Sequence, residues 1–457
     1  MSPRLSLRSI RSTLAQPTVR PRPATLRPTS SPRPSAHRFA SSYSSLAGPP
    51  RKGIKIGHLF TALALLGIGA TSYGLYQFYQ TFTAYPDTPT HPIRSKLRAA
   101  LRAQSSGEFE RASSFFDEAY ALALELASTG ELGSTEEAVM RTTGIAVRWG
   151  GMWEEVGELG RAIAAYDTGF QPVAAAVEGY KGGEGAPPSR AEVMRGAGIA
   201  LKLGDLWVGL GGPEGNHEAE RYYTWAVEEL MRLTLTDTQK AKVKAEMQRQ
   251  EAGPTEATAA PAKTDEQDDL ELPGWVGEVE LVAAFERLGE LYSRQGKVEF
   301  AQPLFQQAIA LLLPPPRKDA PKAPPPPIPQ RCHAATLMNN LSSALVAAPS
   351  PAADAIDASA RWARQALHIA NACKREADKA RNGKDVPLAE KEEGECELTA
   401  VVSSYNLGKL SELSKDPVSA EQWFVQSGKL AVKLGLLDAA RQANEAIRRL
   451  KHPTVRQ

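Results

Sequence analysis

Acidic residues are absent from the first 86 positions of this 457-residue chain, because Asp87 is the first carboxylate in the sequence. Residues 1–55 carry eleven basic side chains instead. Subtracting these eleven from the 54 basic residues leaves 43 against 52 acidic residues for 56–457, a net charge of −9. A mildly acidic body argues against nucleic acid as a partner, since phosphate backbones are bound by clustered basic residues.

Cysteine is scarce, and Cys332, Cys373 and Cys396 stand far apart in the sequence. No CxxC pair occurs. We therefore exclude a disulfide framework as the stabilising device of this fold. Apolar residues make up 42% of the chain, so we expect burial of apolar side chains to hold the body together.

Signatures of catalysis are also absent: the sequence has no GxxxxGK[ST], no GxSxG and no glycine-rich dinucleotide turn. His217-Glu218 begins an HExxH-like string, but Arg221 stands where the second histidine is needed. Cys332-His333 has no further ligands at zinc spacing, which favours a structural cysteine. We predict neither an enzyme nor a cofactor, with a repeat-fused zinc peptidase as the alternative that metal analysis would test.

The basic N-terminus has the pattern of a mitochondrial presequence. The opening MSPRLSLRSIRSTL places apolar residues between regularly spaced arginines, as in a short amphipathic basic helix. Arg38-Phe39-Ala40-Ser41 is similar to a matrix-peptidase site cut after Ala40. We assign residues 1–40 to the presequence and 41–56 to a disordered basic linker. A merely disordered tail is the alternative.

Residues 59–78 form a run of twenty uncharged, mostly apolar residues, long enough to cross a hydrocarbon layer of about 30 Å. We assign 57–82 to a transmembrane helix with its flanks; a buried helix of a soluble body is the alternative. Arg51, Lys52 and Lys55 precede the span, and positive flanks stay on the side of lower potential. With a cleaved presequence, this predicts the mitochondrial inner membrane, with the C-terminal body in the intermembrane space.

An internal repeat follows the span. Small and aromatic residues in 282–315 recur at a fixed spacing: Leu288-Gly289, Tyr292, Gly296, Ala301, Phe305 and Ala308, with Pro314 one place late. This spacing resembles the tetratricopeptide repeat, a pair of antiparallel helices. Gly289 and Ala301 leave room for a close crossing and Gly296 makes the turn. Tyr292 and Phe305 are expected to fill the seam against the next repeat.

The same frame recurs along the chain. Its further copies are Trp149-Gly150 to Gly169, Leu407-Gly408 to Ser427, Gly107 to Ala119, Leu203-Gly204 to Ala226, and Leu341 to Ala366. The last two copies need insertions between their helices. The sequence therefore predicts an all-α fold: a tetratricopeptide-repeat superhelix of about six helical pairs with one N-terminal transmembrane helix.

The repeats divide the body into segments. We place repeats one to three in 93–235, a fourth in 275–313, and the remaining repeats with a capping helix in 331–451. Between them lie a disordered acidic insert at 236–274, a proline-rich insert at 314–330 expected to be extended polyproline II, and a charged loop at 378–395. We interpret the inserts as surface loops, with docking motifs as the alternative.

The concave surface of such a superhelix is lined by the first helix of each pair, including its sixth position. Through the six copies that position holds hydrogen-bond donors: Arg98, Arg148, Lys202, Arg287, Asn340 and Asn406. This row could hold an extended peptide by its carbonyl oxygens and favour acidic segments, unless it is polar only because it faces water. The carboxylate clamp of tetratricopeptide co-chaperones is not expected, since Leu97 and Leu101 occupy its places.

The whole layout, with the juxtamembrane YPDTPTHPIRSKLRAAL, resembles the fungal mitochondrial inner-membrane tetratricopeptide adaptor of the i-AAA protease. The resemblance implies a role in protein quality control: binding unfolded or unassembled membrane-protein clients and recruiting them to the i-AAA protease complex and its other adaptor subunit. Two alternatives have a similar layout, a respiratory complex III assembly factor and an outer-membrane import receptor.

Overall fold

The computed structural model describes residues 85, 88, 90–183, 185–234, 278–314, 325–348, 351–381 and 393–451. Every regular element in these ranges is a helix, which confirms the all-α prediction. The predicted presequence, basic linker, transmembrane span and acidic insert lie outside the described residues, as does most of the proline-rich insert. None of the described helices is long and apolar enough to cross a membrane.

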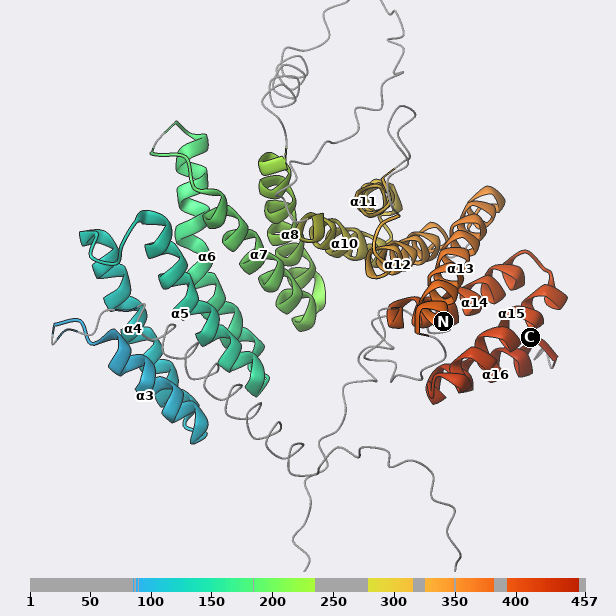
Figure 1. The fold of residues 1–457 in the computed structure, drawn as a ribbon, viewed down its shortest axis with the longest axis horizontal. Coiled ribbons are helices and arrows are strands. Elements are labelled where there is room, and N and C mark those ends of the chain that lie inside the picture. Colours follow the sequence, from blue (N-terminus) through green and yellow to red (C-terminus); the bar gives the residue numbers. More distant parts are fainter. Residues whose placement is uncertain are drawn as a thin grey trace, which may run out of the picture.

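The described helices form six antiparallel pairs and one closing helix, ordered along an arc from α3 to α16 (Figure 1). Their bounds are α3 Ile93–Ser105 and α4 Phe109–Thr129; α5 Thr135–Val156 and α6 Leu159–Lys181; α7 Arg190–Leu210 and α8 Gly212–Thr234; α10 Glu278–Gln295 and α11 Val298–Leu312; α12 Ile328–Leu345 and α13 Ala353–Arg381; α14 Gly394–Leu413 and α15 Pro417–Lys433; and α16 Leu437–Lys451.

Helix starts and turns follow from local sequence. Ser134 and Ser189 each begin a first helix with a capping box, in which the serine accepts from the backbone N–H three residues on and a glutamate bonds back. Gly296 turns the chain between α10 and α11 at φ +77°, as its position predicts. Lys415 takes the equivalent place between α14 and α15 at φ +60°.

Within a pair, an aromatic ring of the second helix packs on a glycine of the first. A Cβ added at Gly204 would lie 2.2 Å from the ring of Tyr223, and one at Gly408 would lie 2.7 Å from the ring of Phe424. Phe305 packs in the same way on Gly289 of its own pair, at 3.2 Å. The expectation that Phe305 fills the seam against the next repeat was therefore wrong, because the missing glycine side chain leaves the space inside the pair.

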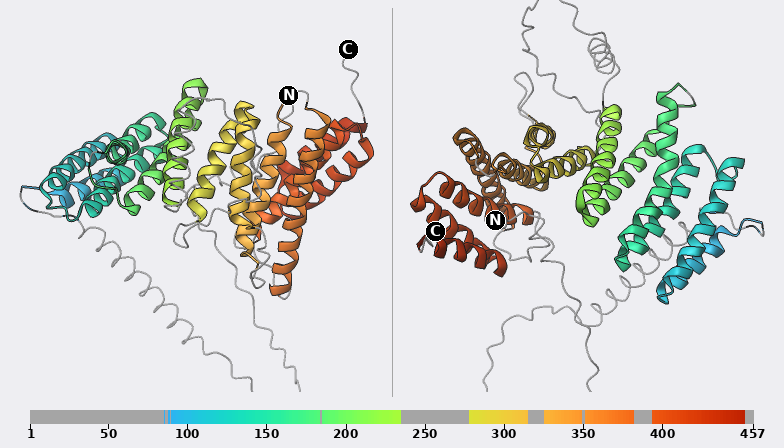
Figure 2. Two further views of the ribbon diagram at one scale, coloured as in Figure 1. Left: turned by 90° about the horizontal axis from the view of Figure 1, so that it is seen from above. Right: turned by 180° about the vertical axis from the view of Figure 1, so that it is seen from behind.

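Successive pairs stack side by side in one row (Figure 2). The first helices approach one another: α5 contacts α7, α7 contacts α10, α10 contacts α12 and α12 contacts α14. Second helices of successive described pairs make no comparable contact. Since the elements closest together lie on the inside of a curved stack, the first helices line its inner face.

Three boundary expectations differ from the structure. The copy around Gly204 has no inserted loop, because α7 and α8 are separated only by Gly211 and the extra residues lengthen the helices. The predicted proline-rich extended segment ends earlier than 330, since α12 begins at Ile328 with a proline in its first turn. The ends of the predicted 378–395 loop are helical, and Arg381 at the end of α13 pairs with Glu393 just before α14.

A disulfide joins Cys332 of α12 to Cys396 of α14 across 64 residues of sequence. The exclusion of disulfides as a stabilising device was therefore wrong at this one place. The wide spacing of the cysteines in the sequence did not predict their distance in space. Stacking brings first helices of consecutive pairs together and places the two Cα atoms 4.7 Å apart.

Candidate binding surface on the first helices

The predicted row of donors lies on the first helices, and its members bond across to the preceding first helix. Lys202 Nζ on α7 donates to Glu154 Oε1 on α5 at 2.5 Å. On the next first helix, Arg287 Nη1 donates to Asp205 Oδ1 at 2.6 Å. Each of these ion pairs therefore joins two neighbouring pairs of helices along the inner face.

Three more members of the row follow the same rule. Arg148 Nη2 on α5 donates to Gln104 of α3 at 3.3 Å. Asn340 Nδ2 on α12 lies 3.5 Å from Glu290 of α10. Asn406 Nδ2 on α14 donates to Asn339 Oδ1 at 3.0 Å and to Ser343 Oγ at 3.2 Å, both on α12. The row therefore links neighbouring pairs of helices. Five of its six donors already form hydrogen bonds to the preceding first helix.

Arg98 differs from the other five because α3 is the first helix of the described stack. It is exposed and has no earlier described first helix to bond. Arg94 and Arg102 lie one turn on either side of it on the same face, and α3 contains no acidic residue. Arg94 Nε donates to the Tyr85 carbonyl at 2.5 Å, and Arg102 Nε to the Arg98 carbonyl at 3.3 Å. No carboxylate of the described ranges forms an ion pair with these three guanidinium groups, which we call the α3 arginine stripe.

A cleft of about 580 Å³ opens between the C-terminal ends of α3, the helix that carries the stripe, and α5. Its lining combines apolar side chains with polar ones: Leu101, Gln104, Ser105, Phe109, Arg148, Glu155 and Val156. Val156 is 39% exposed, a large value for an apolar side chain. The cleft thus has an apolar wall next to Arg148, Gln104 and the Glu155 carboxylate, which bonds to both of them.

Tyr85 also docks on the inner face near this end. Its hydroxyl donates to the carbonyl oxygen of Arg141 on α5 at 2.9 Å. It closes over Gly144, where an added Cβ would lie 3.2 Å from the hydroxyl oxygen. Burial raises the pKa of Tyr85, and the Arg141 and Arg195 guanidinium groups oppose that shift. A side chain from outside the helical pairs can therefore be held by a carbonyl of this surface.

The inner face is closed more tightly at its other end. His333 on α12 lies between Glu286 of α10, at 3.2 Å, and Glu395 of α14, at 3.4 Å. Burial lowers the pKa of His333, but its hydrogen bonds to both carboxylates outweigh burial and raise the pKa to about 10. The imidazolium therefore ties three successive first helices together.

A match to known families gives this architecture a name. The sequence model described as tetratricopeptide repeat matches residues 284–319, the segment that contains most of α10 and all of α11. The chain therefore contains one segment that is similar to a tetratricopeptide repeat. No curated protein sequence matches the chain.

Three solved structures are similar to the chain at low sequence identity. BtubC from P. vanneervenii is 16% identical, with 63% of this chain and 80% of that one covered and a TM-score of 0.34. The TPR2AB domain of yeast Sti1 in its pHSP90 complex is 12% identical, with 79% of this chain and 98% of that one covered and a TM-score of 0.25. The quorum sensor NprR from B. thuringiensis is 11% identical over 86% of both chains, with a TM-score of 0.32.

The sixth-position pattern indicated the donors on the first helices but not their acceptors. Glu154 stands six residues after Arg148, and Asp205 stands three residues after Lys202. Only the three-residue spacing keeps the acceptor on the same helix face as the donor, so the sequence carried this signal for Asp205 and not for Glu154. The stripe was missed because only one position per repeat was compared.

Proposed function

We propose that this tetratricopeptide-repeat protein is a polypeptide-binding adaptor that receives extended, acidic client segments at the N-terminal end of its inner face. The observation that carries the proposal is the α3 arginine stripe, three cations without a carboxylate partner in the described ranges. The other donors of the row are occupied by neighbouring helices, so a client would have to break those bonds to use them. Unpaired guanidinium groups can bind carboxylates without that cost.

The tyrosine on the inner face supports a peptide as the ligand class. Tyr85, which precedes the first described helix, donates to a backbone carbonyl of α5, so a residue from outside the helical pairs already occupies this face. The adjoining cleft supplies an apolar wall through Phe109 and Val156. The proposed client is therefore an extended segment in which acidic and apolar or aromatic residues alternate.

Within the cell, we propose that the protein is held in the mitochondrial inner membrane with its helical body in the intermembrane space. There it would bring unassembled membrane proteins to the i-AAA protease. The support is the presequence-like N-terminus, the uncharged run at 59–78, and the resemblance of the layout to that adaptor family. A client bound beside the protease has a raised effective concentration at its pore.

The binding site is tested by charge reversal on α3. We expect the double variant Arg98→Glu, Arg102→Glu to bind a fluorescein-labelled peptide of alternating Glu and Leu about tenfold more weakly in fluorescence anisotropy, because two charge-assisted contacts become repulsive. Wild-type binding should also weaken as salt is added. Arg361→Glu, Arg364→Glu on α13 is the matched control, since these exposed arginines lie on a second helix. Equal losses in the two double variants would refute the stripe as the site.

The cellular role is tested by affinity purification in mild detergent. The i-AAA protease as a stoichiometric partner supports the proposal, whereas complex III subunits in its place favour the assembly-factor alternative. Sequencing the mature N-terminus separates the remaining alternative. Cleavage after Ala40 leaves Ser41 first, while an outer-membrane import receptor retains its N-terminus.

A further inference from the structure

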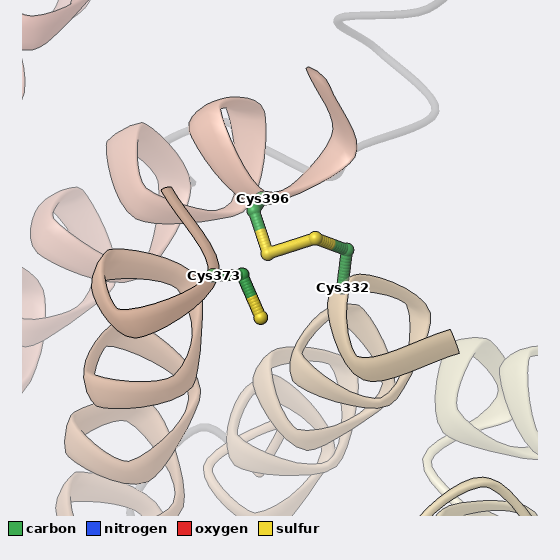
Figure 3. Close-up of side chains that lie close together, drawn as sticks. All are labelled: Cys332, Cys373 and Cys396. Atoms are coloured by element: carbon green, nitrogen blue, oxygen red, sulfur yellow. A yellow bond between two sulfur atoms is a disulfide. The ribbon is translucent and has the colours of Figure 1, made fainter. Parts of the chain in front are cut away.

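Three cysteine side chains from three helices meet in the C-terminal part of the stack (Figure 3). Cys332 of α12 and Cys396 of α14 form the disulfide, and Cys373 of α13 is a free thiol. All three sulfur atoms lie within 4.8 Å of one another, and all three residues are buried. A thiol this close to a disulfide is placed to react with it.

The buried cluster that holds the three cysteines is apolar and combines alanines with larger side chains. Ala363, Ala370 and Leu367 belong to it. Burial raises the pKa of the Cys373 thiol; the nearby Arg331 guanidinium lowers it, and the Glu376 carboxylate, 2.8 Å from Arg331, raises it.

We propose that the three cysteines form a thiol–disulfide exchange site, in which Cys373 displaces one sulfur of the Cys332–Cys396 disulfide. The Cys373 thiolate attacks Sγ of Cys332 or of Cys396, and a new sulfur–sulfur bond forms while the old one breaks. The displaced sulfur leaves as a thiolate and takes up the proton that Cys373 gave up. The exchange needs no external oxidant or reductant, since one disulfide and one thiol are present before and after it.

Exchange removes the covalent link between α12 and α14. The original disulfide joins the first helices α12 and α14 of consecutive pairs, whereas a Cys332–Cys373 bond stays within one pair and a Cys373–Cys396 bond joins α13 to α14. Each bonded cysteine neighbours a member of the inner-face ion pair, His333 after Cys332 and Glu395 before Cys396. In either product, only noncovalent contacts hold α12 against α14 at this end.

The test maps disulfides in the full-length protein after incubation with a trace of reduced glutathione, quenching with acid and digesting with pepsin. We expect the Cys332–Cys396 peptide to dominate, with a Cys373-containing disulfide at about a tenth of its amount, a ratio equivalent to about 1.4 kcal/mol. With atmospheric oxygen as the oxidant, Cys396→Ser should form the Cys332–Cys373 disulfide and Cys332→Ser the Cys373–Cys396 disulfide. Cys373→Ala should hold Cys332–Cys396 alone, and circular dichroism checks that each variant is folded.

A wild-type protein that holds only Cys332–Cys396 after this incubation overturns the proposal, whatever the single variants do. So does a protein in which all three cysteines remain thiols, with or without a retained metal ion detected by mass spectrometry. Because disulfide mapping needs neither a client nor a protease, it can fail while the proposed function stands, and the reverse holds as well.

Discussion

The interface between α5 and α7 and the interface between α12 and α14 occupy equivalent places in the stack but are built differently. The first is linked by Lys202–Glu154 and by Arg195 Nε donating to Thr143 Oγ1 at 3.1 Å. The second holds a disulfide, the His333–Glu395 contact and buried polar bonds such as Thr336 Oγ1 to Thr399 Oγ1 at 2.9 Å. Leu413 at the C-terminal end is the one exposed residue of α14, whereas α7 has exposed residues at both ends and in its middle.

The two ends of the inner face therefore differ in how far their polar side chains are already bonded to neighbouring helices. Serine and threonine side chains let α12 and α14 pack closely and bond directly, so little of that inner face remains open to a ligand. At the other end, α3 has no earlier described first helix to satisfy its arginines. Under the proposed function, client binding is expected near α3. The α12–α14 interface is expected to be the more rigid of the two.

The largest expected effect comes from removing the covalent tie at the α12–α14 interface. Cys332→Ala, Cys396→Ala should lower the free energy of unfolding of the C-terminal pairs by about 4 kcal/mol, since the disulfide closes a loop of 64 residues. Hydrogen exchange followed by mass spectrometry should locate faster exchange in α12 and α14. Equal acceleration in α5 and α7 would contradict the contrast between the two interfaces.

Packing within pairs should not differ between the two ends. Gly204→Ala and Gly408→Ala both drive a Cβ into a fully buried ring, and each should cost about 2–3 kcal/mol in urea unfolding. Gly198→Ala on α7 is the control, because its added Cβ meets nothing within 4 Å. It should stabilise the helix by about 1 kcal/mol. A loss of unfolding free energy in only one of these two variants would mean that packing within pairs also differs between the two ends of the stack.

The His333 contact makes the C-terminal interface sensitive to pH. Its folded-state pKa of about 10 exceeds the ordinary value of 6.5, so its stabilisation is complete below about pH 6.5 and disappears as pH rises through 10. His333→Gln leaves Glu286 facing Glu395 and should cost about 2 kcal/mol at neutral pH. Melting temperatures of wild type and variant should converge by pH 10 or above. A gap that is constant with pH would show that the imidazole acts only by packing.

Sequence spacing predicted the features that recur between repeats, such as the glycines at helix crossings. It did not predict the disulfide, which occurs once. Gly204 and Gly408 lie at the helix crossings that their frame indicated, because a close approach demands a small residue at a fixed place. The Cys332–Cys396 bond had no such signal, since no spacing rule links residues this far apart until the stacking of pairs is known.

The sequence predicted where the donors of the candidate site lie, but not whether they are already hydrogen-bonded to a neighbouring helix. The sixth-position donors do lie on the first helices, but the carboxylates of Glu154 and Asp205 engage Lys202 and Arg287. Whether a donor is available depends on the neighbouring helix, which a single repeat cannot reveal. Only Arg98, at the end of the described stack, lacks such a neighbour.

The smallest expected effect is the one that isolates the inner-face links themselves. Lys202 and Glu154 have about a third of each side chain exposed, 36% and 35%, so solvent screens their ion pair. Lys202→Ala should therefore cost only about 0.5 kcal/mol in urea unfolding, and less when salt is added. Asn406→Ala, at the equivalent position of the C-terminal interface, should cost about 1.5 kcal/mol, because Asn339 and Ser343 lose a donor in a more buried place. Similar losses of unfolding free energy in the two variants, or a salt effect on Asn406→Ala, would contradict this comparison. Either result would mean that solvent reaches the two interfaces equally and that the α12–α14 interface is not the closed end of the inner face.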